Sequence, residues 1–188
     1  MRDRKWIAVA AIVGMVAILA LVIGTKYNTL VSEREEVNNS WAQVQNVLQR
    51  RNDLIPNLVA TVKAYAAHEK EVFTQIAEAR AKLAGARTPA QVAEADSKLE
   101  SALARLLVIA EAYPELKANQ NFAHLQDELA GTENRIAVER QRYNDAVRDY
   151  NQRIKRFPTN VVARTFNFDH HDYFEADPTA QRVPEVRF

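Results

Sequence analysis

The run Asp169-His170-His171-Asp172 is the one stretch whose residue types suggest metal chemistry. Imidazole nitrogens and carboxylate oxygens bind Zn²⁺, and a zinc site takes three or four such groups. Neighbouring side chains on one loop rarely converge on a single ion, and the other histidines, His68 and His124, are distant along the chain. We therefore interpret the run as a solvated loop, and keep a metal-binding or enzymatic role for it as an alternative.

Other catalytic patterns are missing from the sequence. The chain has no Cys, which excludes thiol catalysis, disulfides and thiolate metal ligands. Only two of its four glycines, Gly85 and Gly131, lie beyond residue 24, and neither belongs to a phosphate-binding loop or a nucleophile elbow. The paired carboxylates Glu35 and Glu36 fall on the polar face of a predicted helix. We therefore predict that the protein is not an enzyme and has no catalytic residues, metal or cofactor.

The elements that position these residues begin with twenty uncharged residues, from Trp6 to Thr25. At about 1.5 Å per residue, a helix of this length spans the roughly 30 Å hydrocarbon core of a bilayer. The run has no polar face, unlike a core helix of a soluble protein, and it exceeds the apolar region of a cleaved signal peptide. We predict a retained signal-anchor that spans a membrane, with these residues inside the bilayer: Trp6, Ile12, Val16, Leu19 and Val22.

Flanking cations predict the orientation of this anchor. Arg2, Arg4 and Lys5 precede the run, and only Lys26 and Arg34 follow it closely. Because cations near a span favour the cytoplasmic side, we expect a cytoplasmic N-terminus. The remaining chain would then lie in the periplasm or outside the cell.

Composition predicts what the remaining chain can be. Removing the first 26 residues takes away four cations and one anion, which leaves 21 Lys and Arg against 23 Asp and Glu. A chain of about 160 residues can build a core, but one so close to neutral offers no electrostatic footprint for nucleic acid. Abundant Ala, Leu, Glu, Arg and Gln with few glycines favours helices over short strands. We predict an all-α protein that does not bind nucleic acid.

Apolar residues recur every three or four positions from Tyr27 onward, which predicts amphipathic helices. No Pro or Gly separates the first helix from Lys26, so it can continue from the apolar run as one rod. We expect Asn52 or Asp53 to cap a second helix that has Pro56 in its first turn and ends at Gly85. Alternatively, Pro56 kinks one continuous helix.

Two further helices follow. Thr88-Pro89-Ala90-Gln91 is a capping box with Pro in the first turn, and predicts a helix that ends before Pro114. The longest helix runs from Phe122 to Phe157, where Pro158 ends it. The predicted domains are a basic flank at 1–5, the transmembrane signal-anchor at 6–25, a helical bundle at 26–157 and a C-terminal tail at 158–188.

The tail has no helical period and is rich in aromatic residues: Phe166, Phe168, Tyr173, Phe174 and Phe188. Large apolar side chains are costly to expose, so we expect this irregular tail to pack on the bundle, with a partner-binding surface as the alternative. Asn144 and Asn151 flank Tyr143 and Tyr150, and a buried Asn can fix the register of helices. Our candidates for the helix seam or for protein contacts are Tyr27, Leu30, Trp41, Tyr143, Tyr150 and Phe157.

Several long blocks resemble the bacterial LemA family. They are Tyr27–Val31, Arg34–Val37, Trp41–Val44, Leu48–Val59, Glu111–Asn119, Leu125–Leu129, Thr132–Ala137, Arg140–Asn151, Phe157–Asn160 and Tyr173-Phe174. The resemblance covers nearly the whole chain and departs from the usual pattern at His170-His171. It implies a membrane-anchored antiparallel bundle of four principal helices without a catalytic motif. It also implies a link to envelope maintenance and to membrane-protein partners.

The predicted function combines these expectations. The chain is expected to be a single-pass, membrane-anchored scaffold or adaptor of the cell envelope that acts through helix-mediated protein contacts and self-assembly. Its expected partners are the lipid bilayer, further copies of the chain and other membrane proteins. An oligomeric membrane-remodelling module is a further alternative, beside metal-binding or enzymatic use of the Asp169–Asp172 loop.

Overall fold

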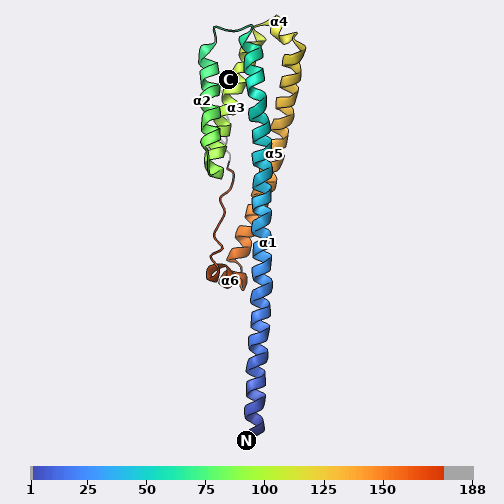
Figure 1. The fold of residues 1–188 in the computed structure, drawn as a ribbon, viewed down its shortest axis with the longest axis vertical. Helices are drawn as coiled ribbons and strands as arrows, with labels where there is room; N and C mark the ends of the chain where they lie inside the picture. Colours follow the sequence, from blue (N-terminus) through green and yellow to red (C-terminus); the bar gives the residue numbers. More distant parts are fainter. Residues whose placement is uncertain (1, 176–188) are drawn as a thin grey trace, which may run out of the picture. The chain divides into compact units, whose positions relative to one another are not determined.

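The computed structural model describes residues 2–175, and helices are the only regular elements in that part of the chain, as the composition predicts (Figure 1). The helices are α1 (Arg2–Lys63), α2 (Lys70–Gly85), α3 (Pro89–Glu111), α4 (Pro114–Lys117), α5 (Gln120–Lys155) and α6 (Thr159–Thr165). The chain divides into two compact units. Among the described residues, unit 1 comprises 2–40 and Asp145–His171, and unit 2 comprises Trp41–Asn144 and 172–175.

Helix α1 is 62 residues long and contains Pro56. The expectation of a new helix at Asn52 or Asp53 is therefore wrong, and the alternative of one continuous helix through Pro56 is correct. The helix stops instead after Lys63, where the backbone N–H groups of Tyr65 and Ala66 both donate to the Val62 carbonyl, at 3.0 and 2.9 Å.

This turn, residues 64–69, interrupts the predicted helix 52–85. It contains no Gly or Pro, so local propensity gives no reason for it. Tertiary packing explains the turn, because the reversal of chain direction buries Val62, Ala66 and Val72 in one core. Burying an aliphatic side chain contributes about 1.5–3 kcal/mol, more than the few tenths that separate most residues in helix propensity.

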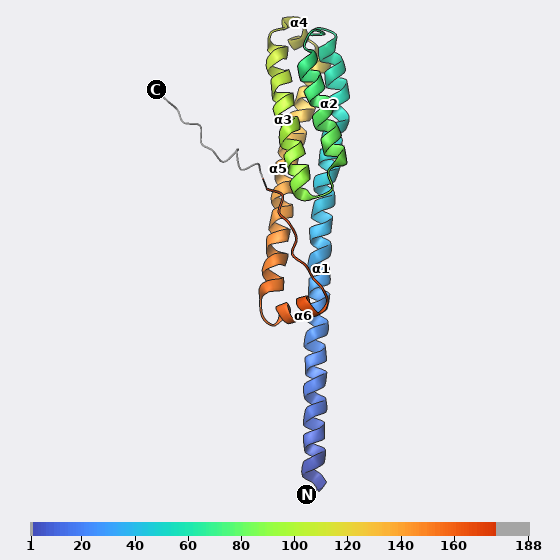
Figure 2. The same ribbon diagram turned by 90° about the vertical axis from the view of Figure 1, so that its left-hand side faces the viewer.

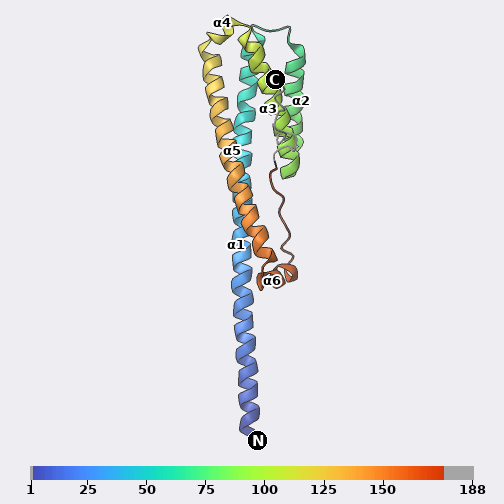
Figure 3. The same cartoon turned by 180° about the vertical axis from the view of Figure 1, so that it is seen from behind.

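The core of unit 2 joins residues from five helices. Figures 1 and 3 show α2 and α3 side by side within this unit. The buried cluster consists of Ile55, Leu58 and Val62 of α1, Ala66 of the turn, Val72, Phe73, Ile76 and Ala79 of α2, Leu99, Ala102, Leu103, Leu106 and Ala110 of α3, Leu116 of α4 and Phe122 of α5. Their three- and four-residue spacing is the pattern from which the helices were predicted.

The start of α3 follows the predicted capping box. The Thr88 hydroxyl accepts from the Gln91 backbone N–H at 3.2 Å, and Pro89 occupies the first turn. The Gln91 side chain accepts from the Arg87 N–H at 2.9 Å, one residue earlier than in the standard box. Two donors at the helix start are satisfied in this way.

Unit 1 contains the first part of α1, the end of α5 and all of α6, and Figure 2 shows α6 beside α1. The Tyr27 ring contacts Phe166 and Phe168 edge-on, with centroids 5.0 and 5.6 Å apart. Residues 159–165 are helical, which corrects the expectation of an entirely irregular tail. Thr159, Val162 and Ala163 of this helix are buried, and this three- to four-residue spacing was hidden among the prolines and aromatic residues of the tail.

Candidate interaction site

The apolar run lies on the surface of unit 1. The predicted membrane residues Trp6, Ile12, Val16, Leu19 and Val22 are all exposed within the protein. Among the described residues, α1 is the one helix that is long and apolar enough to cross a membrane, by length and composition. No part of its most apolar stretch is buried by the rest of the chain, as it would be in the core helix of a soluble protein.

Two of the seam candidates are buried in unit 1. Leu30 of α1 and Tyr150 of α5 are almost completely inaccessible, whereas Tyr27 remains partly exposed. Burial raises the pKa of Tyr150, whose hydroxyl has no hydrogen-bond partner among the described residues. The centroid of its ring lies 5.0 Å from that of His171. Nearby in unit 1, Arg153 Nη2 forms an ion pair with Glu33 Oε1 at 2.7 Å.

The side chain of Asn151 binds the backbone of the segment that follows α6. Its Nδ2 donates to the His171 carbonyl at 2.8 Å, and its Oδ1 accepts from the His171 N–H at 3.0 Å. A carboxamide presents a donor and an acceptor side by side, so it pairs with a peptide group as another peptide would. Asn151 thus binds an extended segment, and the expected role in helix register is replaced by this contact.

Asn144 makes the same contact in unit 2. Its Nδ2 donates to the Phe174 carbonyl at 3.0 Å, and its Oδ1 accepts from the Phe174 N–H at 2.9 Å. The Tyr143 hydroxyl donates to the Asp172 carbonyl at 2.7 Å, and burial raises the pKa of Tyr143 to about 12. These three hydrogen bonds fix the segment 172–174 on α5.

Aromatic contacts complete this part of unit 2. Trp41 lies 5.1 Å from Tyr143 and 6.1 Å from Phe174, measured between ring centroids. The Arg140 guanidinium carbon lies 4.5 Å from the centre of the Phe174 ring, within the range of a cation–π contact. The structure therefore brings the seam candidates Trp41 and Tyr143 together.

Phe157 is the seam candidate that takes part neither in the contacts around Tyr150 nor in those around Trp41. It follows α5, and 83% of its surface is exposed. It does not contribute to a buried seam and remains a candidate for an external contact.

The Asp169–Asp172 run does not gather metal ligands. The backbone of His171 is bound by Asn151, and the carbonyl of Asp172 accepts from Tyr143. Across residues 2–175 no three His, Cys, Asp or Glu side chains are grouped so that they could hold a metal ion. The geometry of the described residues gives no support to the metal-binding alternative.

A buried ion cluster in unit 2 went unpredicted. Arg51 Nη1 lies 3.1 Å from Asp96 Oδ1 and 2.9 Å from Glu133 Oε2, and both Arg51 and Asp96 are almost fully buried. Burial raises the pKa of Asp96 to about 6, although the positive charge of Arg51 opposes this rise. The sequence does indicate that Arg51 is buried, because it falls between Leu48 and Ile55 in the apolar stripe of α1.

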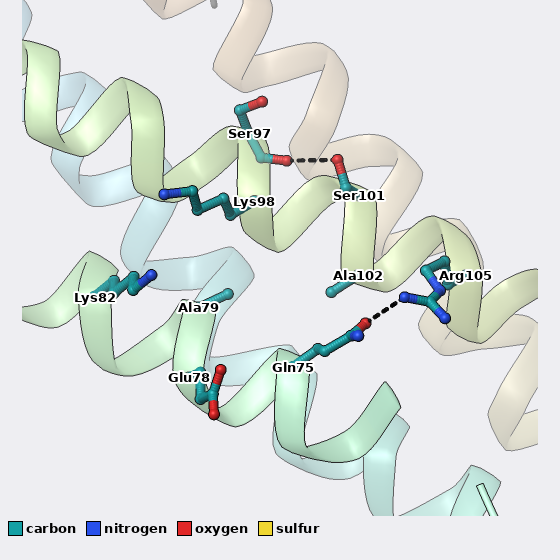
Figure 4. A pocket seen from close by; sticks show the side chains of 9 residues that line it. All are labelled: Gln75, Glu78, Ala79, Lys82, Ser97, Lys98, Ser101, Ala102 and Arg105. Atoms are coloured by element: carbon teal, nitrogen blue, oxygen red, sulfur yellow. Dashed lines mark hydrogen bonds between the residues drawn. The ribbon is translucent and has the colours of Figure 1, made fainter. Parts of the chain in front are cut away.

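Two of the hollows on the surface of unit 2 differ in character. The hollow between α2 and α3, of about 400 Å³, is crossed by a hydrogen bond of 2.8 Å from Arg105 Nη1 to Gln75 Oε1 (Figure 4). Lys82 and Lys98 line its other end, and the Ser101 hydroxyl donates to the Ser97 carbonyl at 3.0 Å. No His lines this hollow, so it holds no serine–histidine pair of the kind that activates a nucleophile.

The second hollow is apolar. It lies between α1, α3 and α5 and is lined mainly by Leu58, Leu103, Leu107 and Leu129. Its volume of about 220 Å³ is below the range of roughly 300–1,000 Å³ for small-molecule sites.

Several known proteins are similar in sequence to this chain over most of its length. The Magnetosome proteins MamQ 1 and MamQ 2 of Paramagnetospirillum magneticum are each 26% identical over 196 residues, covering 90% of this chain and 72% of theirs. Protein LemA of Metamycoplasma hominis is 26% identical over 155 residues, covering 82% of this chain and 70% of its own length. A family model described as the LemA family matches residues 40–188. Because this match covers most of the chain and confirms the resemblance, the protein belongs to the LemA family.

Proposed function

We propose that this protein is a single-pass, membrane-anchored scaffold or adaptor of the bacterial cell envelope. The observation that carries the proposal is the exposed apolar run of α1. The most apolar stretch of this helix is not buried by any other part of the described chain, and leaving so much apolar surface in water is costly. A bilayer is the solvent that such a surface requires.

The proposal assigns the parts of the chain as the sequence suggested. Residues 1–5 form the cytoplasmic flank, 6–25 the anchor in the inner membrane, 26–157 an antiparallel four-helix bundle, and 158–188 a tail on that bundle. Neither the family description nor the names of the relatives state an enzymatic activity, which supports a non-catalytic role. The protein would act by presenting helix surfaces to other membrane proteins and to further copies of itself.

The anchor is tested by extraction of membranes with alkaline carbonate. We expect the full chain to stay in the membrane pellet. Replacing Val16 and Leu19 together by Arg should shift the protein to the soluble fraction, because a charged residue at the centre of a span costs about 2.5–3.5 kcal/mol. Replacing both residues by Ile is the matched control. Release of the unaltered chain by carbonate would rule out the anchor.

Self-assembly is tested separately on the purified full chain. Anchoring confines copies to a surface and raises their effective concentration, so weak helix contacts suffice for association. We expect mass photometry in detergent to show oligomers whose fraction grows with concentration, and crosslinking in native membranes to capture the same species. A monomer at all concentrations and in the crosslinked membranes would contradict this part of the proposal.

A further inference from the structure

We propose that the corner between α5 and α6, residues 155–166, docks on the anionic surface of the bilayer from which α1 emerges. The inference rests on the proposed anchor at residues 6–25. It adds to that anchor a second membrane contact, made by residues more than a hundred positions away in sequence. All residues involved belong to unit 1.

The corner lies at the level where α1 leaves its apolar run. Phe166, at the end of the corner, contacts the ring of Tyr27 at 5.0 Å. Tyr27 is two residues beyond Thr25, which is about 3 Å along a helix axis. Figures 1 and 2 agree in showing α6 directly beside α1 at this level. If the apolar run fills the hydrocarbon core, the corner therefore lies among the lipid headgroups.

The outward face of the corner is apolar. Phe157 is 83% exposed, Val161 57% and Phe166 47%. The buried face of α6 is formed by Thr159, Val162 and Ala163, so the exposed side chains of Phe157 and Val161 lie outside it. Phe166 packs one edge against Tyr27 and leaves 47% of its surface exposed. Apolar side chains on a surface helix beside a bilayer enter the boundary between headgroups and acyl chains.

Charge indicates which surface the corner meets. Lys155, Arg156 and Arg164 are all exposed, and residues 155–166 contain no Asp or Glu, which gives a net charge of +3. Such a cluster attracts anionic phospholipids, and it would repel the same corner of a second copy. Basic residues around exposed Phe and Val match a membrane interface better than they match a protein partner.

The test uses site-directed spin labels in the full chain, which has no native Cys. Single Cys residues are placed at Val16 in the apolar run, at Val161 in the corner and at Val138 in unit 2, where the exposed fraction is 48% against 57% for Val161. Each labelled chain is reconstituted in nanodiscs that contain phosphatidylglycerol or only phosphatidylcholine. The measurement is the collision rate of each label with a water-soluble nickel chelate.

We expect the label at 161 to be several-fold less accessible than the label at 138 in phosphatidylglycerol nanodiscs. The protection should fall in phosphatidylcholine, in about 1 M salt, and when Lys155, Arg156 and Arg164 are replaced by Gln, because each change weakens surface electrostatics. The label at 16 should stay protected in all of these conditions. A chain with Phe157→Ser should also lose protection at 161.

The outcomes separate the corner from the anchor. Protection at 16 with equal accessibility at 161 and 138 overturns the corner proposal and leaves the anchor intact. Free access at 16 overturns both. Protection at 161 that does not depend on anionic lipid, together with spin–spin broadening that vanishes on dilution with unlabelled chain, assigns the corner to a contact between copies and overturns the lipid proposal.

Discussion

At the residue scale, two asparagine side chains form hydrogen bonds with the backbone of an extended segment, as a neighbouring strand does in a sheet. Asn144 and Asn151 each donate to and accept from a single peptide group, of Phe174 and His171 respectively. Without them, these backbone groups would lose their partners in partly buried positions. The two side chains thus give an extended segment a definite register on α5.

Replacing either Asn by Ala should release its part of the extended segment. The loss leaves one backbone donor and one acceptor unpaired, so we expect a cost of about 1–3 kcal/mol at each site. Amide hydrogen exchange should accelerate at His171 in Asn151→Ala and at Phe174 in Asn144→Ala. The exposed Asn134→Ala is the control and should change stability by no more than about 0.5 kcal/mol. Unchanged exchange at 171 and 174 would show that these hydrogen bonds do not hold the segment.

Asp96 should make stability depend on pH. Its pKa is raised from 3.8 to about 6 in the folded state, so folding favours the protonated carboxyl. The stabilisation from this group is complete below about pH 3.8 and is lost as pH rises to about 6. The loss is about 3 kcal/mol, at 1.36 kcal/mol per pKa unit. Urea unfolding of the full chain in detergent between pH 4 and 7 measures it.

Substitutions separate the two charges of this pair. Asp96→Asn should remove the fall in stability between pH 4 and 6 and should equal or exceed the original chain at pH 7. Arg51→Met should instead cost about 3–5 kcal/mol, because it leaves a buried carboxylate without its cation. The exposed Glu115→Gln controls for net charge. A loss of several kcal/mol in Asp96→Asn at pH 7 would mean that the attraction of Arg51 outweighs the desolvation of Asp96.

At the scale of elements, the sequence predicted what local rules determine. The capping box at Thr88 and the helical period of α3 and α5 have local causes and match the structure. The stop at Pro158 also has a local cause, although α5 already ends at Lys155, two residues before the predicted end at Phe157. The turn at 64–69 has no local cause, because burial of Ala66 and its neighbours decides it. Helix α6 and the two Asn contacts depend on partners far away in sequence, which periodicity cannot reveal.

Gly131 tests how far local propensity contributes to α5. It lies inside this helix, and a Cβ added there would meet no atom within 4 Å. Gly131→Ala should therefore stabilise the protein by about 1 kcal/mol, the difference between the two residues in a helix interior. Thermal unfolding followed by circular dichroism measures the gain. The opposite change at a nearby exposed site, Ala137→Gly, should destabilise by a similar amount; no gain at 131 would indicate that the site needs the freedom of Gly.

At the scale of the whole molecule, the apolar surfaces that the protein leaves exposed indicate what it contacts. The helices of unit 2 bury one another, whereas the apolar run of α1 and the face around Phe157 have no cover in the described chain. Sequence reasoning identified the first surface because twenty residues form it consecutively. Tyr27 and Phe157 were predicted only as separate contact residues, because the corner that reaches Tyr27 lies more than a hundred residues away along the chain. The two surfaces together favour a protein organised around a membrane.

Orientation in that membrane depends on a small charge difference. Arg2, Arg4 and Lys5 precede the run against Lys26 and Arg34 after it, and Lys155, Arg156 and Arg164 are too far along the chain to count. We therefore expect a Cys at the exposed Glu111 to react with a membrane-impermeant maleimide before cell lysis, and a Cys at Asp3 only after lysis. Arg4→Glu with Lys5→Glu should reduce early labelling at 111, whereas Arg4→Lys with Lys5→Arg should not. Labelling at 111 only after lysis would reverse the assignment and place the corner cations on the cytoplasmic leaflet, the side that basic residues beside a span ordinarily occupy.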